Sequence, residues 1–195
     1  MQNILKKLFT TLAAHYGTTH WWPGDTPFEI AVGAILTQNT AWTNVEKAIA
    51  NLKREKLLHP KRILDAPLET LESAIRSSGY FRQKARRLKI FCEYLQNHYG
   101  GSMKRMAATP TAALRCELLS INGIGPETAD DILLYACEKP VFVVDAYTRR
   151  ILSRHGLIQE DLRYDALQKI FHDNLPNEVS LFKAVSYTHL RAHET

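Results

Sequence analysis

One carboxylate stands in a setting that suits chemistry. Asp145 follows the apolar residues 141–144 (VFVV) and precedes the polar stretch 146–150 (AYTRR). A carboxylate beside apolar surroundings can stabilise a developing positive charge and orient an attacking water molecule. Aspartate is also favoured just before the first turn of a helix, where it accepts backbone hydrogen bonds. The position therefore predicts a helix cap, a catalytic carboxylate, or both.

A tight turn with two glycines lies upstream of Asp145, where residues 120–126 read SINGIGP between two helical patterns. Gly123 and Gly125 permit positive φ and close backbone approach, and Ile124 between them can anchor the turn in the core. We expect a helix–hairpin–helix whose backbone donors face a DNA phosphate without reading sequence. The expected phosphate-binding residues are Asn122, Gly123, Ile124, Gly125 and Thr128. A plain corner between two helices, closed by a glycine, is the alternative.

Other phosphate-binding loops do not fit this turn. GIGPET lacks the third glycine of a dinucleotide fingerprint, and the segment before it is helical where the fingerprint needs a strand. The Gly-Lys-Ser/Thr of a Walker loop is also missing. The missing strand and the missing third glycine exclude a nucleotide-binding oxidoreductase.

The elements that position these residues are nearly all helices. Residues 4–17 carry apolar side chains at helical spacing, and residues 27–38 are apolar all round, as in a buried helix. Only residues 141–144 have strand composition, and four residues alone make no sheet. The sequence predicts an all-α fold of short helices joined by short loops.

Composition narrows the class of protein. The 195 residues are 45% hydrophobic and 23% charged, typical of a soluble globular chain of one unit or two small lobes. The net charge of +5 favours an anionic partner, with nucleic acid first. Cys92, Cys116 and Cys137 are too few and too widely spaced for a disulfide framework or a metal site. No apolar run approaches the roughly 20 residues of a membrane span, and no signal peptide is recognisable. We expect a cytoplasmic, nucleoid-associated protein.

The combination of motifs resembles the endonuclease III-like (HhH-GPD) superfamily of DNA glycosylases, and within it the 3-methyladenine DNA glycosylase III branch. INGIGPETAD, then Pro140 and VVDAYTRRI, follow the family signature, and FEIAVGAILTQNT resembles its pocket-lining helix and loop. The resemblance spans residues 21–184. It implies a helix–hairpin–helix glycosylase fold in residues 1–185, with a cleft between two helical lobes. One lobe comprises about 25–135; the other comprises the N-terminal helix and 136–185.

The resemblance also assigns roles. Asp145 is the expected catalytic aspartate, and double-stranded DNA containing damaged bases is the expected partner of a monomer. Trp21, Trp22 and Trp42 are expected to stack on the extruded base, although tryptophans also commonly fill cores. Gln38 and Asn39 match the loop that fills the vacated base stack. Arg149 is expected to contact phosphate, as is Arg150; the edge made by Arg82, Lys84, Arg86 and Arg87 either contacts phosphate or is a solvated face.

Three departures from the family pattern matter. Glu127 stands where bifunctional members carry a lysine, and without that amine no Schiff base and no lyase step is expected. Four cysteines that hold an iron–sulfur cluster in many members are missing. Because this chain stops before that region, we expect no cofactor in it, and the resemblance implies a [4Fe-4S] cluster in the C-terminal part of the intact protein. Residues 186–195 (SYTHLRAHET) lose the apolar periodicity, which suggests a non-native tail on a truncated C-terminus.

The function predicted from the sequence is a monofunctional DNA glycosylase of base excision repair. It would hydrolyse the N-glycosidic bond of alkylated purines such as 3-methyladenine. A mismatch-specific adenine or thymine glycosylase on the same scaffold is the enzymatic alternative. A non-catalytic helix–hairpin–helix DNA-binding module is the alternative from another class, and it would need neither Asp145 nor the tryptophans.

Overall fold

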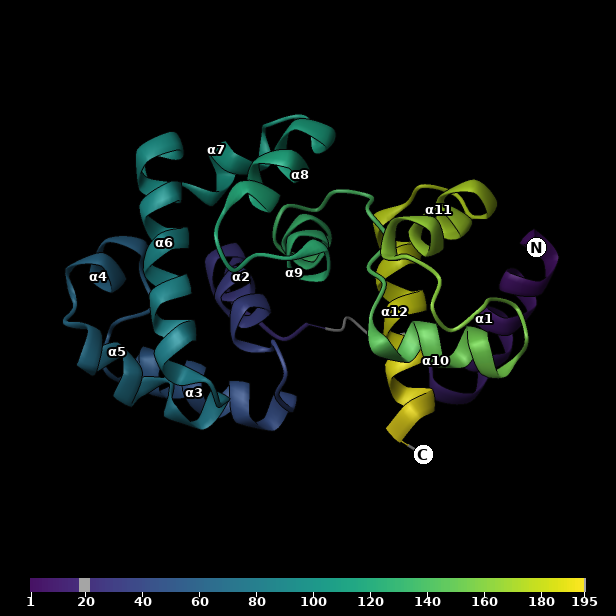
Figure 1. Cartoon of the computed structure of the whole chain (residues 1–195), viewed down its shortest axis with the longest axis horizontal. Coiled ribbons are helices and arrows are strands. Elements are labelled where there is room, and N and C mark those ends of the chain that lie inside the picture. The colour runs from purple at the N-terminus through teal and green to yellow at the C-terminus, as the bar shows by residue number, and fades with distance from the viewer. Residues whose placement is uncertain (18–21, 195) are drawn as a thin grey trace. The chain divides into compact units, whose positions relative to one another are not determined.

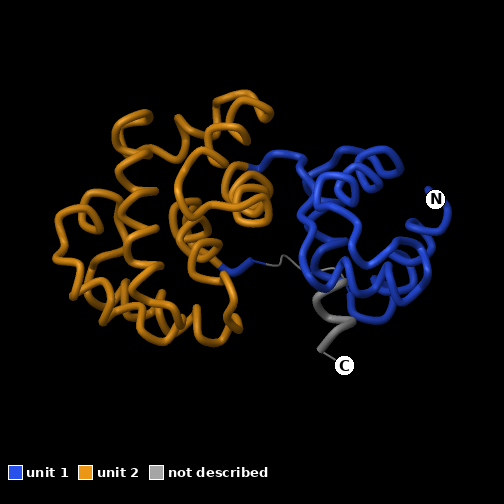
Figure 2. The backbone as a smooth tube through the Cα atoms, viewed as in Figure 1, with its two compact units in different colours: residues 1–23, 138–195 blue, residues 24–137 orange. Residues whose placement is uncertain are grey.

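The computed structural model describes residues 1–17 and 22–194, with side chains through residue 188. All regular elements in these residues are helical, which confirms the predicted all-α class. The chain divides into two compact units, Gly24–Cys137 and the combination of Met1–Pro23 with Glu138–Thr195 (Figure 2). In the described part of the chain, no helix has both the length and the apolar character needed to cross a bilayer.

The Gly24–Cys137 unit is built around one buried helix, α2 (Pro27–Leu36). Figure 1 shows α2 between α6 and α9, and it contacts α3 as well. The other helices of this unit are α3 (Trp42–Arg54), α4 (Pro60–Asp65), α5 (Leu68–Ala74), η1 (Arg76–Ser78), α6 (Phe81–Tyr99), α7 (Met103–Ala107), α8 (Thr111–Ser120) and α9 (Pro126–Asp131), continued by η2 (Ile132–Ala136). The buried helix expected from residues 27–38 is therefore confirmed, although it ends at Leu36.

Local chemistry explains where α2 begins. The Thr26 hydroxyl accepts a hydrogen bond from the Glu29 N–H at 3.1 Å, and the Glu29 carboxylate accepts one from the Asp25 N–H at 3.1 Å. This reciprocal arrangement satisfies backbone donors that a helix start leaves unpaired. Glu29 is buried, and its carboxylate forms a salt bridge with Lys53 of α3, with 2.6 Å between the Lys53 Nζ and the Glu29 Oε1. The start of α2 is thus fixed to α3.

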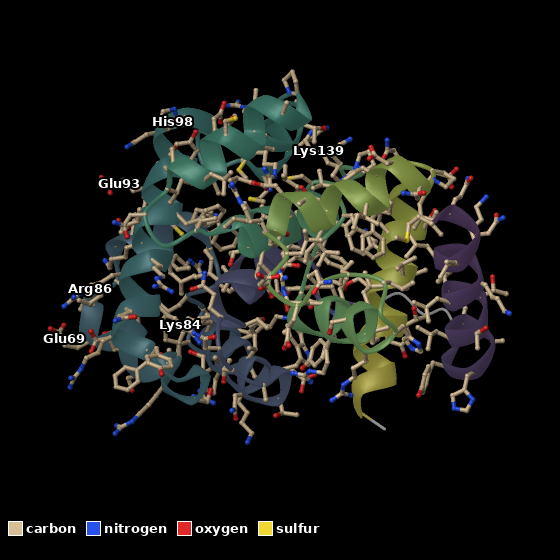
Figure 3. The ribbon with its side chains drawn as sticks, turned by 45° about the vertical axis from the view of Figure 1, so that its right-hand side comes forward. Glu69, Lys84, Arg86, Glu93, His98 and Lys139 are labelled. Carbon is tan, nitrogen blue, oxygen red and sulfur yellow. The ribbon has the colours of Figure 1, made fainter. Side chains whose placement is uncertain are left out.

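The other end of α2 is held by a buried lysine. Lys84 of α6 is only 1% exposed, and its ammonium donates to the carbonyl oxygens of Leu36 at 2.9 Å and Ser78 at 2.6 Å. Loss of hydration, and then the charge of Arg87, lower the pKa of Lys84 to about 8. The expectation that Lys84 belongs to a basic edge is wrong. Figure 3 shows Lys84 within the unit and Arg86 pointing outward from the same helix.

The other unit contains α1 (Gln2–Tyr16), α10 (Ala146–Arg154), α11 (Tyr164–Asn174) and α12 (Val179–Glu194). Helix α12 packs against α1 and α10. Phe142 stacks on Phe171 of α11, with ring centroids 3.7 Å apart, and meets Phe182 of α12 edge to face at 5.5 Å. These three rings are fully buried and form the core of this unit.

The C-terminal helix continues past the point at which the sequence analysis ends the domain. Helix α12 runs to Glu194, and the side chains of Ser186 and Thr188 are buried. The loss of apolar periodicity after residue 185 therefore does not end the helix, because polar side chains can continue a helix whose earlier turns are anchored. The foreign origin of residues 186–195 is a separate matter and stays a prediction.

Candidate functional site

The predicted hairpin is present. Helix α8 ends at Ser120, α9 begins at Pro126, and Ile124 between them is 5% exposed. The Ile124 N–H closes the turn by donating to the carbonyl oxygen of Ile121 at 3.0 Å. Asn122 and Gly125 lie exposed at its surface. A buried apolar anchor below exposed backbone is the geometry that we expected for a phosphate-contacting turn.

The two glycines of the hairpin serve different purposes. Gly123 has φ 90, a conformation that side chains with a Cβ seldom adopt. Gly125 has φ −92 and ψ 178, which any residue can adopt, so the turn does not use the positive φ that glycine permits there. A Cβ added to Gly125 would meet no atom within 4 Å. Neither conformation nor packing within the chain demands glycine at position 125.

Arg87 of α6 lies across Gly123. A Cβ at Gly123 would come within 2.6 Å of the Arg87 Cγ and 2.7 Å of its Nε. The Arg87 guanidinium also donates to the side-chain oxygen of Gln38. This arginine therefore packs on the hairpin, whereas Arg82 and Arg86 of the predicted basic edge are exposed.

Gln38 fastens the loop after α2 to the hairpin. Its side-chain nitrogen donates to the carbonyl oxygen of Gly123 at 3.0 Å and to the Thr128 hydroxyl at 2.9 Å. Both ends of the Gln38 amide are thus engaged within the unit. Asn39, the second expected wedge residue, is exposed and has φ 52. The structure therefore places Asn39 at the surface and Gln38 against the hairpin; the wedge role of both stays a prediction.

Thr128 is buried, and its hydroxyl is the acceptor for Gln38. That hydroxyl supports the hairpin from inside, so a phosphate contact of Thr128 would have to use other atoms. Below it, Asp130 is fully buried and pairs with Arg115 of α8 through two bonds of 2.7 and 3.1 Å. This bidentate pair joins the two helices that flank the turn.

Glu127 is exposed in the first turn of α9. A carboxylate there interacts favourably with the positive end of the helix, but it repels a phosphate at the same place. The side chain cannot form a Schiff base. The absence of a lyase step, which the sequence analysis drew from this residue, stays a prediction.

Asp145 is the N-cap residue of α10 and is half-buried. Its carboxylate accepts a hydrogen bond from the Thr148 N–H at 2.7 Å. Burial raises the pKa of Asp145, and hydrogen bonds from Thr148 and from the Tyr147 backbone only partly oppose that shift. The helix-cap interpretation is confirmed. Because a cap bond uses one side of the carboxylate and burial strengthens its field, the same residue can also stabilise a nearby cation.

The structure describes two of the three tryptophans. Trp21 lies outside the described residues. Trp22 is half-buried and has φ 88, an uncommon conformation for a residue with a bulky side chain. Trp42 opens α3, is half-buried, and its indole N–H donates to the Glu46 carboxylate at 2.9 Å. Neither Trp22 nor Trp42 is a fully buried core filler, and their role in a base pocket stays a prediction.

Arg149 holds a loop of its own unit. Its guanidinium donates to the carbonyl oxygen of Glu160 at 2.9 Å and to that of Leu162. Arg150 lies over the ring of Tyr147, 6.0 Å from its centroid. If Arg149 also binds a phosphate, its guanidinium must do so while it bonds to the carbonyl oxygens of Glu160 and Leu162.

The cysteines do not fit an iron–sulfur cluster. Cys92 and Cys137 are buried and Cys116 is exposed, and no disulfide joins any of the three. Burial raises the pKa of Cys92 to about 12, so this thiol stays protonated at neutral pH. Across residues 1–17 and 22–188, no group of three or more His, Cys, Asp or Glu side chains is arranged to hold a metal ion. We derive no chemical step through a metal.

Sequence reasoning missed the supporting residues. Arg87 and Lys84 looked alike in the sequence, yet one packs on the hairpin and the other is buried beneath α2. Both residues lie among apolar residues of the same helix, Ala85 and Leu88 among them, and their residue type gives no sign of which long-range contact each one makes. The glycine at position 123 was the one available signal, because a glycine in a tight turn can indicate a neighbour packed closely against the backbone.

One unit contains a helix–hairpin–helix, and the other contains an aspartate that caps a helix. This combination defines a class of DNA repair proteins, and comparison with known proteins places the chain in the same class. Residues 32–177 match the HhH-GPD superfamily of base excision DNA repair proteins. A Methanocaldococcus jannaschii protein named as a DNA repair glycosylase is 48% identical over 182 residues, covering 92% of this chain and 82% of that one. The endonuclease III of Thermotoga maritima is 31% identical over 152 residues, covering 76% and 67%.

A solved structure extends the similarity to the fold. The H. pylori 3-methyladenine DNA glycosylase bound to 1,N6-ethenoadenine has a TM-score of 0.84 and 29% identity, covering 98% of this chain and 96% of that one. The chain belongs to the HhH-GPD superfamily, and it is a DNA glycosylase of base excision repair.

Proposed function

We propose that this DNA glycosylase is monofunctional and removes N-alkylated purines, 3-methyladenine among them. The observation that carries the proposal is Asp145, a half-buried carboxylate held by the first turn of α10 with its pKa raised by burial. Similarity to the H. pylori 3-methyladenine glycosylase supports the substrate class. Glu127 supports the absence of a lyase step, because a carboxylate cannot attack the sugar as an amine.

The proposed reaction needs few protein groups. The C1′–N bond breaks, its electron pair leaves with the base, and the sugar becomes a cation that the Asp145 carboxylate stabilises. Water then adds its oxygen to C1′, and its proton passes to the carboxylate or to solvent. A base alkylated at a ring nitrogen carries positive charge and departs as a neutral molecule. No general acid is required for that substrate.

Base recognition is assigned to the tryptophans. An electron-rich indole attracts a cationic purine by about 0.5–2 kcal/mol, which corresponds to roughly 2- to 30-fold in affinity. Trp42 suits this role because its N–H is bonded to Glu46, which fixes the ring at the start of α3. Trp42→Ala should lose about 1–3 kcal/mol of stacking while slow excision persists.

The proposal is tested by incubating the protein with DNA treated with dimethyl sulfate. Chromatography of the soluble fraction should show 3-methyladenine, and the DNA should keep its strands intact until alkali cleaves the abasic sites. Borohydride should trap no covalent protein–DNA adduct. Release of a mismatched adenine or thymine without release of any methylated base would replace this proposal with the mismatch-specific alternative.

A further inference from the structure

The segment that leads into Asp145, residues 141–144, is buried and belongs to neither a helix nor a sheet. Val141, Phe142, Val143 and Val144 are each at most 5% exposed. Buried backbone N–H and C=O groups need hydrogen-bond partners, which a neighbouring strand normally supplies. The Val141 N–H donates to the carbonyl oxygen of Lys139, whereas side chains of one helix bond to the backbone of Phe142 and Val144.

Three residues of α11 bond to this backbone. The His172 Nε2 accepts from the Phe142 N–H at 3.2 Å, and the Gln168 amide donates to the Phe142 carbonyl oxygen at 2.7 Å. The Tyr164 hydroxyl accepts from the Val144 N–H at 3.2 Å. Residues 164, 168 and 172 are four apart, so they share one face of the helix. We call these three side chains the α11 ladder.

The partners of the ladder are themselves fixed. Because the Nε2 of His172 is an acceptor, the ring proton is on Nδ1, which donates to the Asn177 side-chain oxygen at 2.7 Å. The Phe142 ring stacks on Phe171 of the same helix at a centroid distance of 3.7 Å. Both the backbone and the side chain of Phe142 are therefore set by α11.

We propose that Tyr164, Gln168 and His172 are positioning residues that set the place of the Asp145 carboxylate. The proposal rests on the function proposed above, in which Asp145 is the catalytic carboxylate. Val144 is the residue before Asp145, so the Tyr164 bond acts one peptide away from it. On the other side, the Thr148 N–H holds the carboxylate at 2.7 Å. The aspartate is thus restrained by α10 on one side and by the α11 ladder on the other.

Tyr164→Phe provides the test, because it removes the hydroxyl acceptor and keeps the ring. We expect amide hydrogen exchange at Val144 to rise about fivefold, as for loss of one ordinary hydrogen bond. Single-turnover release of methylated bases from dimethyl sulfate-treated duplex should slow by about 10- to 100-fold, the scale on which a misplaced catalytic group reduces rates. Binding of duplex carrying a tetrahydrofuran abasic-site analogue should change by less than about twofold, because no expected DNA contact is lost.

Tyr94→Phe is the matched control. It removes a tyrosine hydrogen bond of 2.8 Å, to Glu117, from the Gly24–Cys137 unit and should leave the excision rate unchanged. Gln168→Leu, which removes the donor to Phe142, provides a second variant should Tyr164→Phe fail to fold. A normal excision rate in Tyr164→Phe, or a slow rate with unchanged exchange at Val144, overturns the ladder. An active Asp145→Asn would instead overturn the proposed function, so the two failures are distinguishable.

Discussion

The side-chain nitrogen of Gln38 donates to the carbonyl oxygen of Gly123 at 3.0 Å, which ties the loop after α2 to the hairpin between α8 and α9. Arg87 completes the arrangement by bonding to the other end of the Gln38 amide and lying across Gly123. The hairpin is therefore contacted by Gln38 from the loop after α2 and by Arg87 from α6. Gln38 would have to leave Gly123 and Thr128 before it could enter a DNA base stack.

Gly123→Ala should destabilise the protein, because alanine would carry a Cβ at φ 90 and press on Arg87. The backbone cost alone is about 1–2 kcal/mol. In an Arg87→Ala background the substitution should cost less, since the clash is gone and only the backbone cost remains. Urea unfolding of the four proteins measures this coupling. If the effects of the two substitutions on the free energy of unfolding add within about 0.3 kcal/mol, the Arg87 side chain can move aside without cost and does not constrain the turn.

Gly125→Ala should lower the affinity for duplex DNA without changing the stability of the fold. Its backbone is extended, and the added methyl group meets nothing in the protein, so the free energy of unfolding should change by less than about 0.5 kcal/mol. The methyl group would stand where we expect a phosphate to approach the hairpin, and affinity for duplex DNA should fall. Fluorescence anisotropy with a labelled duplex measures this. Unchanged affinity would remove Gly125 from the DNA-contacting surface.

Lys84 should give the stability a distinctive pH dependence. Its pKa is about 8 in the folded protein and 10.5 ordinarily, so between these values the unfolded chain binds more protons. The Lys84 contribution to the free energy of unfolding should therefore rise with pH, by on the order of 2 kcal/mol from pH 7.5 to 10. The difference between wild type and Lys84→Met isolates this contribution, because other titrating groups are shared. A difference independent of pH would mean that Lys84 remains fully charged when buried.

Local patterns predicted the parts of the site that depend on neighbours in sequence. The turn at Gly123, the Ile124 anchor and the Asp145 cap each follow from residue type and position within a few residues. The Gln38–Gly123 and Lys84–Leu36 bonds join residues 85 and 48 positions apart, and no local pattern reports such contacts. Residues 141–144 show the same limit: their strand-like composition does not form a sheet, as expected, but it does not report that side chains of a helix bond to their backbone.

Excision should need ionised Asp145. Burial raises its pKa above the ordinary 3.8, so the rate should fall with acid at a pH above that value. The unfolded chain releases this proton first, so Asp145 lowers the free energy of unfolding as pH rises through the folded pKa. Asp145→Asn keeps the helix cap, and its stability at neutral pH should equal or exceed that of wild type. Above neutral pH, excision of a cationic purine should stay level, because no general acid is involved. A fall in the excision rate above neutral pH would indicate that a general acid takes part.

The most direct test of the account is the release of 3-methyladenine from dimethyl sulfate-treated duplex DNA by wild type and by Asp145→Asn, measured side by side with affinity for the same duplex. We predict that wild type releases 3-methyladenine and leaves alkali-labile, uncut strands. Asp145→Asn should bind the duplex with similar affinity and release none. Release by Asp145→Asn at the wild-type rate would contradict the account, because Asp145 would then be a helix cap alone.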